Sequence, residues 1–166
     1  ITRVPVLYED GDVVQNVLEF APREDAKRFE FWESSLANRL GLGEAVRYAI
    51  DVGTSKIEED CGRLAKRLIA QLGQIQNIVV HHHSSTTCGI VTFYSTTVDS
   101  KTIKEKMLTE GFELSVVPAT STPLDSAKLK VPDLVRASVS YTNTEDEIDA
   151  VSQSLASLLG SSIATK

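Results

Sequence analysis

The second half of the chain alternates short apolar runs with polar turns, and this order of elements limits the folds that it can adopt. β-Branched and aromatic residues dominate 78–82 and 89–94, and a polar Ser/Thr turn separates the two runs. Such runs predict neighbouring β-strands. Similar runs at 112–117 and 134–140 predict two more strands. We expect one helix between the second and third strands and another after the fourth.

Both of these helices have residues that favour helix ends. Asp99 or Ser100 can cap the first, and Gly111 follows it where a left-handed residue commonly ends a helix. Thr144 and Glu147 have the spacing of a capping box at the start of the second. The order strand, strand, helix, strand, strand, helix therefore predicts an α+β fold, in which a small antiparallel or mixed sheet carries helices on one face.

The first half of the chain predicts helices. Residues 34–72 have apolar side chains at steps of three or four, but Gly41, Gly43 and Gly53 interrupt the pattern. Because an interior glycine costs about 1 kcal/mol relative to alanine, we expect two helices with a joint at 51–55. Thr54 or Ser55 is the expected cap of the second helix. Residues 1–23 predict irregular or extended structure.

The composition excludes some classes of partner. The net charge of -6 and the absence of a basic run argue against nucleic acid, whose phosphates such a chain repels. No segment approaches the roughly 20 apolar residues that a membrane span requires. Cys61 and Cys88 are too few for a disulfide framework, which favours a reducing compartment, either the cytoplasm or an organellar stroma or matrix.

The most specific pattern is VRASVSYTNTEDEIDAVSQSLASLL, residues 135–159. It resembles the closing strand and helix of class V aminotransferase-like enzymes. These fold-type I, pyridoxal-phosphate-dependent enzymes include cysteine desulfurases, isopenicillin epimerase-like proteins and C–S lyases. Residues 28–53 and 88–93 are also similar to this family. The residues that match the closing motif are Arg136, Ser138, Asn143, Thr144, Glu145, Glu147, Ile148 and Asp149.

The resemblance implies that this chain is the C-terminal portion of such an enzyme. Residues 1–73 then correspond to the end of the large domain with its long linking helix, and residues 74–166 to the small α+β C-terminal domain. The implied partners are an amino-acid substrate and a second copy of the protein, an upstream large domain or another protein subunit.

Arg136 is the candidate substrate-binding residue. It lies on a predicted strand whose neighbours Val135 and Ala137 point to the opposite face. A guanidinium group requires an anion when it is buried, and a carboxylate fits its planar fork. The resemblance implies that this anion is the α-carboxylate of an amino-acid substrate. An ion pair with an Asp or Glu of the same chain is the alternative.

The chain lacks the lysine that such an enzyme needs. Pyridoxal phosphate requires a lysine for its Schiff base, an acid near the ring nitrogen and donors for its phosphate. In the family the lysine follows a histidine, whereas here the run His81–His83 is followed by Ser84. The lysines at 101, 104, 106, 128 and 130 are expected in solvent. We therefore expect no pyridoxal phosphate on this chain alone, and no activity.

The remaining candidates are two serines and the histidine run. Ser34 or Ser35 loosely matches a family hydroxyl that reaches the cofactor phosphate of the neighbouring subunit, although a helix N-cap explains either serine equally well. His81 and His83 share one strand face, but zinc takes at least three protein ligands, so no metal site is predicted even with Cys88 nearby. If the chain is instead the whole mature protein, we expect a non-catalytic binding or assembly subunit.

Overall fold

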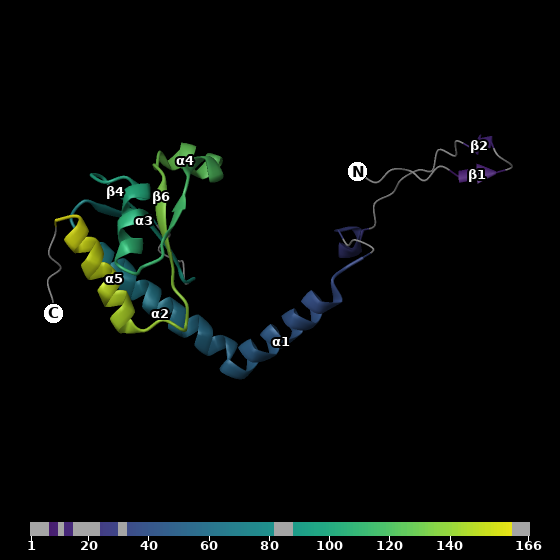
Figure 1. The fold of residues 1–166 in the computed structure, drawn as a ribbon, viewed down its shortest axis with the longest axis horizontal. Helices are drawn as coiled ribbons and strands as arrows, with labels where there is room; N and C mark the ends of the chain where they lie inside the picture. Colours follow the sequence, from purple (N-terminus) through teal and green to yellow (C-terminus); the bar gives the residue numbers. More distant parts are fainter. Residues whose placement is uncertain (1–6, 10–11, 15–23, 30–32, 82–87, 161–166) are drawn as a thin grey trace. The chain divides into compact units, whose positions relative to one another are not determined.

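The computed structural model describes residues 7–9, 12–14, 24–29, 33–81 and 88–160 (Figure 1). They fall into two compact units, Ile1–Gly43 and Glu44–Lys166. The elements of the chain in order are β1 (Leu7–Glu9), β2 (Asp12–Val14), the 3-10 helix η1 (Ala26–Phe29), α1 (Leu36–Val52), α2 (Thr54–Leu72), β3 (Ile78–His81), β4 (Ile90–Ser95), α3 (Ser100–Thr109), β5 (Ser115–Val117), η2 (Ala119–Ser121), α4 (Pro123–Leu129), β6 (Leu134–Ser138) and α5 (Glu145–Leu158).

In the first unit, the described part of residues 1–23 is extended, as the sequence predicts. β1 and β2 pair antiparallel, with Leu7 opposite Val14. Within η1 the Arg28 guanidinium lies over the Phe29 ring, 4.7 Å from its centroid. The rest of the apolar stretch that follows β2, from residue 15 to 20, lies outside the described residues.

The joint between α1 and α2 occurs where the sequence predicts it, but the predicted cap is wrong. Gly53 occupies the N-cap position of α2, and no side chain caps that helix. Its φ of 96° is a left-handed conformation that L-residues with a Cβ rarely adopt. Thr54 is the first residue of α2 and Ser55 is the second, so neither occupies the N-cap position. Because glycine can adopt this conformation, α1 ends before Gly53 and α2 begins after it.

The second unit confirms the predicted α+β fold. Its four strands have the order β3-β4-β6-β5, and all neighbouring strands are antiparallel. The third predicted strand is shorter than expected, because only Ser115–Val117 pairs with β6. The connection 118–132, predicted as a loop, contains η2 and α4.

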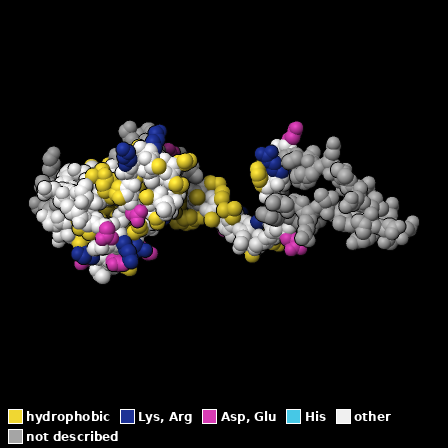
Figure 2. Space-filling model, turned by 90° about the horizontal axis from the view of Figure 1, so that it is seen from above, with side chains coloured by type: hydrophobic (Ala, Val, Ile, Leu, Met, Phe, Trp, Pro, Cys, Tyr) yellow, Lys and Arg dark blue, Asp and Glu magenta, His cyan; other side chains and the backbone are white. Residues whose placement is uncertain are grey.

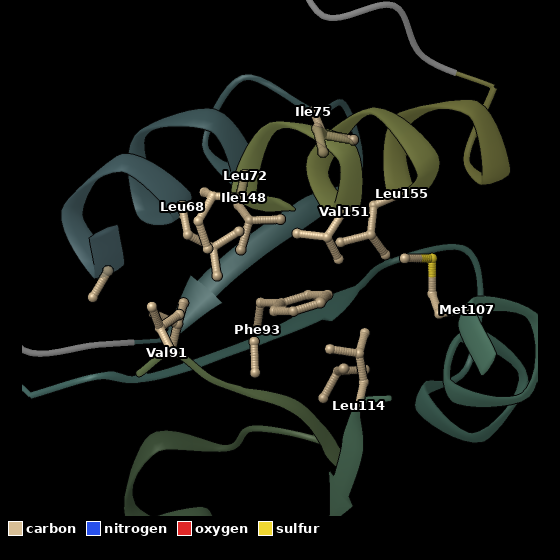
Figure 3. Close-up of a cluster of buried hydrophobic side chains, with 14 of the residues drawn as sticks. Leu68, Leu72, Ile75, Val91, Phe93, Met107, Leu114, Ile148, Val151 and Leu155 are labelled. Carbon is tan, nitrogen blue, oxygen red and sulfur yellow. The ribbon is translucent and has the colours of Figure 1, made fainter. Parts of the chain in front are cut away.

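One face of this sheet carries the helices and the core. Phe93 and Val135 are fully buried on that face, where they meet apolar side chains of α2, α3 and α5 (Figure 3). The buried cluster also includes Leu64, Leu68, Leu72, Ile75, Val91, Ile103, Met107, Leu114, Ile148, Val151 and Leu155. Burying such side chains stabilises the fold by roughly 1.5–3 kcal/mol each. The helices that form this core therefore leave the opposite face of the sheet without core packing.

The predicted helix ends of the second unit are confirmed. The Asp99 side chain accepts a hydrogen bond from the Thr102 backbone N–H at 2.9 Å, and Gly111 has a φ of 89° after α3. At α5, Thr144 Oγ1 accepts from Glu147 N–H at 3.2 Å, and the Glu147 carboxylate accepts from Thr144 N–H at 2.9 Å. This capping box fixes where α5 begins, directly after the strand that carries Arg136.

Helix α1 contrasts with α2, because none of its residues is buried. Large apolar side chains along it are 50–68% exposed, and yellow hydrophobic groups gather over this helix in Figure 2. Helix α2 instead places Leu64, Leu68 and Leu72 in the core beside the sheet. The predicted domain boundary between residues 73 and 74 stays a prediction. None of the described helices has the length and hydropathy to cross a bilayer.

Candidate functional site

Arg136 lies on the sheet face that carries no core. Its neighbours on β6, Val135 and Ala137, are 0% and 7% exposed and point into the core. Arg136 itself is exposed, as is Ser138 two residues further along the same face. Leu134 shares this face but is buried, at 7% exposure. The alternation of side chains along the strand thus presents Arg136 outward, as the sequence predicts.

The register of the sheet aligns four polar residues in one row across this face. His81 on β3 is opposite Thr92 on β4, Thr92 is opposite Arg136 on β6, and Arg136 is opposite Ser115 on β5. The flanking positions Val80 and Phe93, by contrast, pair on the core face. We call His81, Thr92, Arg136 and Ser115 the polar row. Sequence inspection singles out Arg136 and His81 but does not place any of these residues side by side, because strand register depends on long-range pairing.

The electrostatics of the polar row favour an anion. Among the described residues, Arg136 has no acidic side chain within ion-pair distance, whereas several other arginines do. The polar row contains no carboxylate, and Arg136 is its only permanent charge. Thr92 Oγ1 donates a short hydrogen bond to the His81 backbone carbonyl, so that hydroxyl proton is already engaged. Arg136 does not line the cavity of about 280 Å³ between residues 111–114, the end of β6 and α5, although Ser138 does.

A network of charges on the helical side holds α5 against α2. Arg67 on α2 donates from Nε and Nη2 to the two carboxylate oxygens of Asp149, and Gln71 Nε2 donates to the same carboxylate at 2.6 Å. These hydrogen bonds lower the pKa of Asp149 to about 2. Glu145 joins the network through Arg63 and Arg67. Asp149 and Glu145 of the closing motif therefore have structural partners.

A close backbone contact aligns β4 with β6 near Arg136. The Val139 N–H donates to the Gly89 carbonyl at 2.6 Å. A Cβ placed on Gly89 meets the Val139 carbonyl oxygen at 2.0 Å, well inside van der Waals contact. Only glycine fits this position, and this contact lies beside the pair Ile90–Ser138 at the end of the ladder.

The two serine candidates lie at the start of α1, and both are exposed. Ser35 Oγ accepts a hydrogen bond from the Asn38 backbone N–H at 3.3 Å, which is the geometry of a helix N-cap. The structure does not bring Ser34 or Ser35 together with Arg136 in one unit, since the serines belong to Ile1–Gly43. Their role toward a cofactor phosphate stays a prediction.

The histidine run is only partly described. His81 ends β3 on the polar row, whereas His82, His83 and Ser84 lie outside the described residues. Cys61 is half-buried on α2 and Cys88 is exposed. In the described ranges, no three His, Cys, Asp or Glu side chains are close enough to hold a metal ion.

The described residues do not fit pyridoxal phosphate. Every described lysine is exposed, including Lys101, Lys104 and Lys106 on α3 and Lys128 in α4. A lysine that forms a Schiff base has to be positioned in an enclosed site beside the substrate-binding groups. No described lysine belongs to the polar row.

Comparisons with known proteins agree with this fold and this motif. A family model described as Aminotransferase class-V matches residues 14–151. A probable cysteine desulfurase from Halalkalibacterium halodurans is 27% identical over 128 residues, which cover 77% of this chain and 31% of the relative. A second one, from Staphylococcus epidermidis, is 24% identical over 170 residues, which cover 93% of this chain and 41% of the relative. The chain thus spans about a third to two fifths of these relatives.

Solved structures show the same fold at lower sequence identity. The apo form of a cysteine desulfurase from Thermococcus onnurineus NA1 superposes with a TM-score of 0.74 at 19% identity, over 83% of this chain and 34% of that one. A cystine C–S lyase in complex with its product cysteine persulfide gives a TM-score of 0.62 at 23% identity, over 78% of this chain and 32% of that one. Because the family model matches most of its length, this chain belongs to the aminotransferase class-V family.

Proposed function

We propose that this chain is the C-terminal part of a pyridoxal-phosphate-dependent enzyme that acts on an amino acid, with Arg136 binding the α-carboxylate of the substrate. The observation that carries the proposal is the setting of Arg136. It is exposed on the open face of the sheet, and no acidic group of the described residues pairs with it. A carboxylate can therefore take the guanidinium without displacing an internal partner.

The proposed role of Arg136 is to hold and orient the substrate. Two parallel N–H···O bonds from a guanidinium fix both the position and the plane of a carboxylate. They thereby fix the direction in which the α-carbon points away from the sheet. The bond changes themselves require groups outside the described residues, so this chain alone is inactive in our proposal.

The reaction branch is proposed from the relatives. Those reported above are described as cysteine desulfurases and a cystine C–S lyase. We therefore place this protein in the C–S lyase, desulfurase or epimerase-like branch, with an amino acid as substrate. A homodimer, in which Ser34 or Ser35 reaches the partner's cofactor phosphate, is part of the same proposal.

Expression together with any coding sequence upstream of Ile1 tests this function. The longer protein is expected to bind pyridoxal phosphate and to be yellow, and borohydride reduction is expected to bleach this colour while attaching the cofactor covalently to a lysine. The 166-residue chain is expected to stay colourless after incubation with the cofactor and dialysis. A longer protein that contains no lysine able to form the adduct would contradict the enzyme proposal.

A second function, a non-catalytic binding or assembly subunit, is favoured by the surface of α1. This helix exposes a set of large apolar side chains, namely Leu36, Leu40, Leu42, Val46, Tyr48 and Ile50. Exposed apolar surface on this scale commonly marks contact with another protein. Light scattering on the purified 166-residue chain separates the cases, because a stable monomer without a partner argues against an assembly subunit.

A further inference from the structure

We propose that the Ser115 hydroxyl is the second half of the anion site, and that it binds the same carboxylate as Arg136. This inference rests on the proposed function, since it takes Arg136 as the substrate-binding group. It adds a specific partner residue and a direction from which the carboxylate approaches.

The register places the two side chains next to each other. Ser115 on β5 is directly opposite Arg136 on β6. Directly opposed residues of an antiparallel pair have Cβ atoms about 4.5–5.5 Å apart on the same face. The adjacent pair Val116 and Val135 lies on the core face, which confirms that Ser115 points to the open side. When the Arg136 side chain folds over β5, a carboxylate that its guanidinium holds can reach the Ser115 hydroxyl.

The two hydroxyl groups that flank Arg136 differ in availability. On the β4 side, the Thr92 hydroxyl proton is used in the hydrogen bond to the His81 carbonyl. On the β5 side, the Ser115 hydroxyl makes no hydrogen bond to any other described residue, and Ser115 is only half-buried. A hydroxyl carries a single proton, so only Ser115 can donate to a new acceptor without breaking an existing bond. The free donor is therefore on β5, beside Arg136 on β6.

Carboxylate chemistry fits this arrangement. A carboxylate has about four lone-pair sites, and a bidentate guanidinium occupies two of them. The Ser115 O–H can donate to a third site, on the oxygen nearer to β5. Two donors from Arg136 alone leave the carboxylate some freedom to rotate about the axis of the guanidinium fork. A third donor from the neighbouring strand restricts this rotation.

An NMR titration of the 166-residue chain with acetate tests the site. The ionic strength is kept constant, and a parallel titration with chloride is the control. The signals observed are the Arg136 Nε–H and the Ser115 backbone amide. Both are expected to shift along one binding curve. Ser115→Ala is expected to raise the acetate dissociation constant roughly three- to tenfold, the loss expected for one hydrogen bond to a charged group in a solvated setting. Arg136→Ala is expected to remove the response.

Two further variants make the test specific. Ser138→Ala removes an exposed hydroxyl on the same strand face, one pair away from the proposed contact, and is expected to leave the dissociation constant unchanged. Ser115→Asp puts a carboxylate opposite Arg136 and is expected to abolish the acetate response by occupying the guanidinium from within the chain.

The outcomes separate this inference from the proposed function. If Arg136→Ala removes the response but Ser115→Ala leaves the dissociation constant unchanged, the arginine role survives and the serine role is wrong. The serine role is also overturned if Ser138→Ala weakens binding as much as Ser115→Ala does. If acetate shifts the Arg136 signal no more than chloride does, the anion site itself is wrong, and the proposed function loses its substrate-binding residue.

Discussion

Arg67 on α2 donates two hydrogen bonds of 2.7 Å each to the Asp149 carboxylate on α5, although 82 residues separate them in the chain. Gln71, one turn further along α2, donates to the same carboxylate. The contact holds together α2 and α5, two of the helices that pack over the sheet. Because α5 follows β6 directly, this ion pair helps to fix the strand that presents Arg136.

Loss of the Asp149 charge is expected to lower stability. Asp149→Asn keeps the shape of the side chain but removes the ion pair with Arg67, and the free energy of unfolding should fall by about 1 kcal/mol, the upper end for a largely solvated pair. Urea denaturation followed by circular dichroism measures this loss. Asp146→Asn is the control and should cost less, because Asp146 lies in the first turn of α5 and acts on Arg67 only at a distance, without an ion pair to any described cation.

The same ion pair predicts a dependence of stability on pH. The pKa of Asp149 falls from its ordinary value of 3.8 to about 2 in the folded chain. A lowered pKa means that the stabilisation is fully present above pH 3.8 and is lost as the pH falls toward about 2. The stability difference between the wild type and Asp149→Asn should therefore shrink over that window. A difference that stays constant down to pH 2 contradicts the assignment.

Gly89→Ala is expected to disrupt the end of the β4–β6 ladder. The added methyl group meets the Val139 carbonyl oxygen at 2.0 Å, so one of the strands has to move. We expect a loss of about 3 kcal/mol, at the high end for overpacking. Thermal unfolding measures it. Gly43→Ala on α1 provides the control, because nothing lies within 4 Å of its added Cβ, and that variant should be neutral or slightly stabilising.

The capping box of α5 predicts a graded response at Thr144. Thr144→Ala removes the acceptor for the Glu147 backbone N–H and should cost about 1 kcal/mol of stability. Thr144→Ser retains a hydroxyl acceptor and should restore most of this loss. Equal stability of the two variants in chemical denaturation would show that the cap contributes little.

The fold and its helix ends could be predicted largely from local patterns. The apolar periodicity finds the strands and helices, and the spacing of Thr144 and Glu147 finds the start of α5. These signals are local in sequence. The preference for glycine in the left-handed conformation that follows α3, at Gly111, is local as well. The cap of α2 could not be predicted in this way, because Gly53 takes a left-handed backbone where a serine or threonine cap was expected. The short helix α4 was also missed, within a stretch rich in Pro and Ser.

The candidate site could be predicted only in part. Strand alternation places Arg136 outward, but it says nothing about which residues of other strands lie beside it. The pairing of Ser115 and Thr92 with Arg136 depends on register across strands that are far apart in the chain. Similarly, nothing local links Arg67 to Asp149. The spacing of Arg67 and Gln71, four residues apart on one helix face, is a signal only once a carboxylate opposite them is known.

The role of Arg136 is tested most directly by comparing the binding of L-alanine and of ethylamine, which lacks the carboxylate, to the cofactor-loaded longer protein. Spectral titration gives both dissociation constants for the wild type and for Arg136→Ala. Our account predicts that the ratio of the ethylamine dissociation constant to the alanine dissociation constant falls at least about tenfold in the variant, while the dissociation constant for ethylamine is unchanged. An unchanged preference in a folded variant would contradict the assignment of Arg136 to the substrate carboxylate.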